Sequence, residues 1–229
     1  MTGIHAALVS HMPLAILAIL LAAFFDGIDG CVARKLGASS RFGAELDSLS
    51  DFATFGIAPA VIFFVFSLHH LEKFGWAAVL LFSMGMALRL ARFNTHSIEN
   101  THAAWMEGLA TGVPAPAGAY LLLLPVMIHQ WIKVPFSAGF CAAWSIFVAV
   151  LLVSRIPTFL FKGRPSAASP QRARSITMGF LLYIGLAYSF TWATMVFTGV
   201  AYLLLMPVSC RLAYCRKKIL VRGNEKLAP

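Results

Sequence analysis

The sequence predicts an all-α protein, a polytopic bundle of transmembrane helices with about seven full spans. Hydrophobic residues make up 59% of its 229 residues, only 12% are charged, and the mean hydropathy is +0.79. A soluble domain carries roughly twice this charged fraction. The apolar residues also occur in runs that approach the length of about 20 residues needed to cross a bilayer as a helix. The class is therefore an integral membrane protein, expected as a single domain over residues 1–229.

The first expected span begins with an unbroken apolar run at residues 14–25, after Pro13, a residue suited to the first turn of a helix. Residues 1–10 are too short to cross a membrane and are expected to form a truncated N-terminal helix. The later spans are expected at residues 47–68, 76–92, 115–131, 137–156, 176–190 and 192–212, with a polar loop at 94–112 and a basic tail at 213–229.

The basic residues support this topology and argue against a nucleic-acid partner. The net charge is +9, but the lysines and arginines lie at the ends of apolar runs and do not line one polar face. If the loop with Arg34 and Arg41 is cytoplasmic and the spans alternate, all basic residues except Lys73 and Lys133 fall on the cytoplasmic side. The positive-inside rule produces this distribution.

Five of the nine acidic residues lie between positions 26 and 51. Asp26 and Asp29 are spaced i, i+3, and Asp47 and Asp51 are spaced i, i+4, so each pair shares one face of a helix. A short connection between the two segments makes them antiparallel neighbours. The four carboxylates are therefore expected to converge.

Inserting a carboxylate at mid-membrane costs about 2.5–3.5 kcal/mol of free energy, and four carboxylates close together also repel one another. Hard divalent cations, which prefer oxygen ligands, relieve both costs. The pattern therefore predicts Mg²⁺ or Mn²⁺, with two ions between Asp26, Asp29, Asp47 and Asp51 polarising a pyrophosphate for attack.

Small and basic residues occur at helical spacing around these acids. Gly30 and Ala33 clear room for a bulky ligand, Gly43 permits close approach of a backbone or nucleotide, and Arg34 offers a planar fork to phosphate. The alternative is a cytoplasmic loop whose acids only solvate the membrane interface. That alternative does not require Gly, Ala and Arg at these offsets.

The run from Asp26 to Arg34, followed by Gly43, Asp47 and Asp51, resembles the signature of the CDP-alcohol phosphatidyltransferase family. The resemblance implies a divalent metal centre on the aspartates and a homodimer. It implies that Asp51 is the general base on the acceptor hydroxyl. It also implies that the cytidine diphosphate contacts are Gly30, Ala33, Arg34 and Gly43.

Three later segments, 89–94, 108–118 and 154–162, are similar to the bacterial and archaeal phosphatidylserine synthase branch of this family. That similarity implies CDP-diacylglycerol and L-serine as substrates, in a prokaryotic inner membrane with the active site facing the cytoplasm. Arg92, Asn94 and Lys162 are candidates for binding the acceptor or a lipid phosphate. The ordinary alternative for the arginines and lysine is snorkelling at span ends or contact with anionic headgroups.

Two rival functions stay open. The first is a sister enzyme with glycerol 3-phosphate, inositol phosphate or choline as acceptor. A phosphorylated acceptor should need an additional basic cluster near the motif, and the basic residues there are only Arg34, Lys35 and Arg41. A non-enzymatic cation channel or transporter predicts acids spread through several spans, whereas the later spans contain essentially none.

Overall fold

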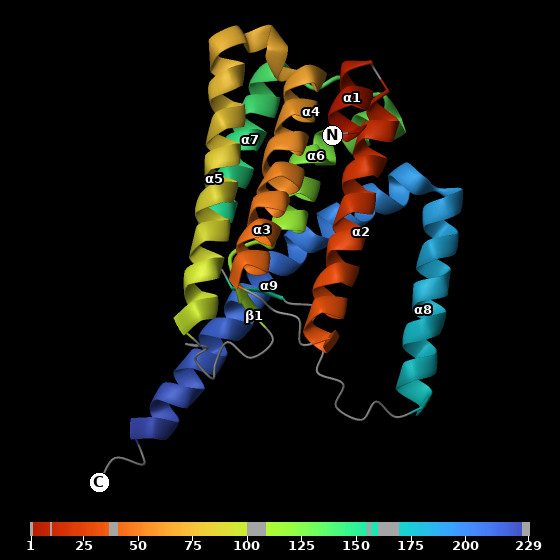
Figure 1. The fold of residues 1–229 in the computed structure, drawn as a ribbon. Helices are drawn as coiled ribbons and strands as arrows, with labels where there is room; N and C mark the ends of the chain where they lie inside the picture. Colours follow the sequence, from red (N-terminus) through yellow and green to blue (C-terminus); the bar gives the residue numbers. More distant parts are fainter. Residues whose placement is uncertain are drawn as a thin grey trace. The chain divides into compact units, whose positions relative to one another are not determined.

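The computed structural model describes residues 2–9, 11–36, 41–99, 109–154, 157–159 and 170–225. The chain divides into two compact units. Unit 1 comprises Met1–Asn100 and Gly112–Ser154, and unit 2 comprises Thr101–Thr111 and Arg155–Pro229. Figure 1 draws the helices of both units. The expectation of a single domain over the whole chain stays a prediction.

Unit 1 is built of helices and contains all the aspartates of the predicted motif. In chain order its elements are α1 (Thr2–Leu8), α2 (Met12–Leu36), α3 (Arg41–Asp51), the π-helix η1 (Phe52–Ile57), α4 (Ala58–Phe66), the 3₁₀-helix η2 (Leu68–Leu71), α5 (Glu72–Glu99), α6 (Ala115–Ile132) and α7 (Ala138–Val153). Helices α3, η1 and α4 follow one another without a break from residue 41 to residue 66.

The short helix α1 packs against α2 and α4. Its buried residues are small, namely Gly3, Ala6 and Ala7. A Cβ atom added at Gly3 would lie 3.3 Å from the carbonyl oxygen of Ala15, so the small residue lets α1 approach the backbone of α2 closely. The segment expected to be the truncated N-terminal helix is therefore helical and packed.

Helix α5 turns back along α4 and packs against α7. The reversal is made at η2, where Glu72 has a positive φ of 44°. Along the α5–α7 contact, Ser145 Oγ donates a hydrogen bond to the carbonyl of Ala78 at 3.1 Å. The fully buried side chains of unit 1 come mostly from α4, α5 and α6, including Phe63, Phe82 and the run 121–123. These helices form the core beside which α2 and α3 lie.

Unit 2 contains helices α8 (Pro170–Ser189) and α9 (Thr191–Glu225) and two short strands. Strands β1 (Leu109–Thr111) and β2 (Pro157–Phe159) pair antiparallel, with Ala110 opposite Thr158. Helices α8 and α9 form a hairpin in which Thr194 Oγ1 donates to the carbonyl of Leu186 at 3.1 Å.

Five of the described helical segments are long and apolar enough to cross a membrane: Met12–Asp29, Phe42–Phe66, Leu68–Thr95, Ala115–Ile132 and Thr191–Arg211. The predicted helical membrane protein is thus supported, but the count of seven full spans is not confirmed. Two further described apolar segments, Ala138–Val153 and Thr177–Ser189, are shorter, and the second is the apolar part of the 20-residue helix α8.

Two local departures concern the loop expected at residues 94–112. Helix α5 continues through the start of this segment to Glu99. Near the end of the segment, Leu109–Thr111 form the strand β1. Polar composition alone did not separate the exposed end of a helix from a loop.

Candidate active site

The two helices that carry the motif are α2, with Asp26 and Asp29, and α3, with Asp47 and Asp51. Both pairs lie within helices, as their spacing predicted. The change from α2 to α3 occurs at residues 37–40, which lie outside the described residues. Helices α2 and α3 run in opposite directions (Figure 1), with their carboxylate-bearing faces close together.

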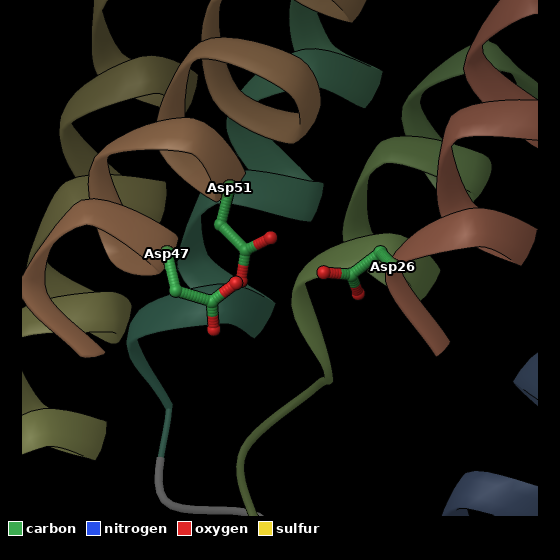
Figure 2. A group of neighbouring side chains, drawn as sticks. All are labelled: Asp26, Asp47 and Asp51. Atoms are coloured by element: carbon green, nitrogen blue, oxygen red, sulfur yellow. The ribbon is translucent and has the colours of Figure 1, made fainter. Parts of the chain in front are cut away.

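Three of the four aspartates form a compact group. One carboxylate oxygen from each of Asp26, Asp47 and Asp51 lies within 4.8 Å of the other two. Figure 2 shows the Asp47 and Asp51 side chains side by side on α3, with Asp26 reaching toward them from α2. Asp26 and Asp51 are half-buried and Asp47 is exposed. Asp47 is therefore the most open of the three carboxylates.

Asp29 lies near this group but outside its closest set. It follows Asp26 by nearly one turn of α2, and its side chain is exposed. It is close enough to Asp47 for the two charges to interact. Three of the four predicted metal ligands are therefore brought together directly, with the fourth beside them.

Of the residues predicted to contact the nucleotide, Gly43 is described most fully. It lies at an exposed position of α3, one turn before Asp47. Gly30, Ala33 and Arg34 continue α2 beyond Asp29, but their side chains lie outside the described residues. Their backbone positions place them on the same helix as Asp26 and toward its end.

The arginines near the end of α5 contact backbone carbonyls of unit 1. Arg89 Nε donates to the carbonyl of Val113, and an Arg92 guanidinium nitrogen donates to the carbonyl of Val153 at 2.8 Å. Arg89 is also close enough to Asp51 for their charges to interact. Both residues therefore join α5 to the start of α6 or the end of α7, close to the acidic group.

Asn94 contacts the motif helix itself. Its Nδ2 lies 2.9 Å from Ser48 Oγ, one residue beyond Asp47. Lys162, the third predicted acceptor or lipid-phosphate residue, lies outside the described residues.

Sequence reasoning missed two features next to the aspartates. Ser48 was not singled out, because nothing in the sequence distinguishes it from Ser50 two residues later. The π-helix η1, which begins directly after Asp51, was also missed. Within it, the carbonyl of Gly56 accepts a hydrogen bond from Ser83 Oγ at 3.2 Å.

The chemistry of this group suits a hard divalent cation. Three carboxylates this close repel one another unless a cation lies between them. Oxygen ligands of this kind are those that Mg²⁺ and Mn²⁺ prefer. Unit 1 is therefore a helical membrane unit with a carboxylate group that can hold a metal ion.

Comparison with known proteins places this unit in a family. The model of the CDP-alcohol phosphatidyltransferase family matches residues 1–154. The chain therefore belongs to the CDP-alcohol phosphatidyltransferase family. The match ends at the residue where unit 1 ends, and it includes every aspartate of the acidic group.

Curated relatives carry a more specific name. A protein of Mycobacterium leprae named CDP-diacylglycerol–serine O-phosphatidyltransferase is 43% identical over 164 residues, which are 69% of this chain and 53% of that protein. A Bacillus subtilis protein of the same name is 34% identical over 161 residues, covering 70% of this chain and 82% of that protein. The chain spans about half the length of the mycobacterial relatives it matches, 53% to 55%.

Proposed function

We propose that the chain transfers the phosphatidyl group of CDP-diacylglycerol to the hydroxyl group of L-serine, giving phosphatidylserine and CMP. The observation that carries the proposal is the convergence of Asp26, Asp47 and Asp51 in a chain of this family. The choice of serine is supported by the shared name of the relatives from Mycobacterium leprae and Bacillus subtilis.

In this proposal Asp26, Asp29, Asp47 and Asp51 hold two divalent ions, Mg²⁺ or Mn²⁺. The bound metal would neutralise the diphosphate and make its phosphorus a better electrophile. These residues suit a hard divalent ion because the closest group, Asp26, Asp47 and Asp51, offers only carboxylate oxygens as ligands.

The residues of the chain then bind the substrates and move one proton. Asp51 accepts the proton of the serine hydroxyl while the serine oxygen forms a bond to the phosphorus that carries the diacylglycerol. The bond from that phosphorus to the oxygen of CMP breaks, and CMP leaves. The cytidine diphosphate is held by Gly30, Ala33, Arg34 and Gly43, and Arg92 and Lys162 bind the serine carboxylate or the lipid phosphate.

The proposed setting is a prokaryotic inner membrane with the active site facing the cytoplasm, and the proposed assembly is a homodimer. Five apolar helices support the bilayer as surroundings. The concentration of basic residues on the side of Arg34 and Arg41 supports the orientation.

Purified protein supplied with CDP-diacylglycerol, radiolabelled serine and Mg²⁺ or Mn²⁺ tests the proposal. Labelled phosphatidylserine should form, should stop after EDTA is added, and should resume when either ion is returned in excess. Formation that persists in EDTA would contradict the metal-dependent mechanism. Absence of labelled lipid under all conditions would contradict the proposed activity.

A further inference from the structure

The hydrogen bond between Ser48 and Asn94 joins the helix that carries Asp47 and Asp51 to the end of α5. Asn94 Nδ2 lies 2.9 Å from Ser48 Oγ, and Ser48 Oγ lies 3.1 Å from Asn94 Oδ1 and 3.1 Å from the carbonyl of Ala44. A hydroxyl has one proton, so Ser48 can donate to Ala44 and accept from the Asn94 amide at the same time. Both bonds then act on the turn of α3 that contains Asp47.

Helix α3 has little other burial to fix its position. Every residue from 42 to 50 is exposed except Ser48, which is half-buried. Even the large apolar side chains point away from the protein, with Phe42 78%, Leu46 56% and Leu49 66% exposed. Besides its continuation into η1 and α4, the polar contact with Asn94 therefore holds these turns of α3.

Asn94, by contrast, extends from a helix that is anchored in the core. Arg89 and Arg92, on the preceding turns of α5, donate to the carbonyls of Val113 and Val153. Deeper in the unit, α5 packs along α7. A side chain from this anchored helix end can therefore set the position of α3.

We propose that Asn94 is a positioning residue that acts through Ser48 to hold Asp47 and Asp51 at the distance from Asp26 that metal binding requires. This inference rests on the proposed metal site. It differs from the expectation that Asn94 contacts the acceptor, and the two roles predict different measurements.

A direct Mn²⁺-binding assay separates these roles. Mn²⁺ is added to the purified protein without substrate, and the bound fraction is measured by electron paramagnetic resonance. Ser48→Ala and Asn94→Ala should each weaken Mn²⁺ binding about tenfold, at the lower end of the effect of groups that orient metal ligands. The double variant should bind no more weakly than either single variant, because both remove the same contact. Ser48→Thr, which keeps the hydroxyl, should bind like the unsubstituted protein.

Matched controls are Ser50→Ala, on the exposed side of the same helix, and Thr95→Ala, whose hydroxyl donates within α5 to the carbonyl of Arg92. Both should leave Mn²⁺ binding unchanged, and thermal unfolding should show that all variants remain folded. In activity assays the KM for serine should stay unchanged in Ser48→Ala and Asn94→Ala.

Two results would overturn the inference while leaving the metal site intact: unchanged Mn²⁺ binding in both alanine variants, or a raised KM for serine in Asn94→Ala alone. Asp47→Asn and Asp51→Asn should weaken Mn²⁺ binding strongly in the same assay. If they do not, the proposed metal site is refuted, and the positioning role of Asn94 is refuted with it.

Discussion

Asp51 and Asp47 lie one turn apart on α3 but have different surroundings. Asp51 is half-buried at the junction with η1 and is close enough to Arg89 for their charges to interact, whereas Asp47 is exposed. A proton acceptor needs a fixed position against the hydroxyl that it deprotonates. These surroundings make Asp51 the better placed of the two for that role.

The first prediction is that Asp51→Asn lowers kcat for CMP release by about 10²- to 10⁴-fold, the usual contribution of a general base. The amide keeps the size of the side chain but cannot take the proton, and it is also a weaker metal ligand than the carboxylate, so the assay is run at saturating metal. Glu45→Gln is the matched control, since Glu45 is an exposed acid on the same helix outside the closest acidic group. Steady-state kinetics in which both variants keep nearly full activity would refute the role of Asp51.

At the scale of elements, the π-helix η1 determines how α3 continues into α4. Ser83 Oγ on α5 donates to the carbonyl of Gly56 within it. A Cβ atom at Gly56 would lie 2.8 Å from a ring carbon of Phe52 and 3.2 Å from Met86 Cγ. The absence of a side chain there allows α5 to approach η1 directly after Asp51.

We therefore expect Gly56→Ala to destabilise the protein by about 1–3 kcal/mol through overpacking, more than the gain of up to about 1 kcal/mol in helix propensity. Thermal unfolding in detergent measures the change. Gly139→Ala in α7 is the control, since nothing lies within 4 Å of the added Cβ. Equal or higher stability for Gly56→Ala than for this control would show that the close approach does not matter.

Much of the element layout could be predicted, because apolar run length and aspartate spacing are local properties of the sequence. The helices of Asp26 and Asp47, and the convergence of their carboxylates, followed from these two signals alone. The π-helix and the Ser48–Asn94 contact could not be predicted, because they depend on how α5 packs against α3 and η1. The β1–β2 pair joins residues about 48 positions apart and has no local signature either.

At the scale of the whole molecule, the helix directions in unit 1 show which residues lie at the same end of the helices as the aspartates and which lie at the opposite end. Helix α4 leads from the acidic group to η2, and α5 returns to Asn94 beside Ser48. At the far end, the ring of His129 on α6 lies 5.4 Å from that of Phe66. Lys73 and Lys133 follow the ends of α4 and α6, so both belong to the end away from the aspartates.

This arrangement predicts which residues a membrane-impermeant thiol reagent reaches in intact cells. In a background with the four cysteines replaced by alanine, Lys73→Cys and Lys133→Cys should be labelled from outside. Glu45→Cys on exposed α3 should be labelled only after the membrane is permeabilised. Labelling of Glu45→Cys in intact cells would reverse the proposed orientation.

CMP release with a panel of acceptors tests whether the chain transfers a phosphatidyl group to serine. Purified protein, CDP-diacylglycerol and Mg²⁺ or Mn²⁺ are incubated in parallel with serine, glycerol 3-phosphate, inositol phosphate or choline. We expect CMP release with serine and none above background with the other three. Release with another acceptor and not with serine would rule out serine as the acceptor, while leaving the chain in its family.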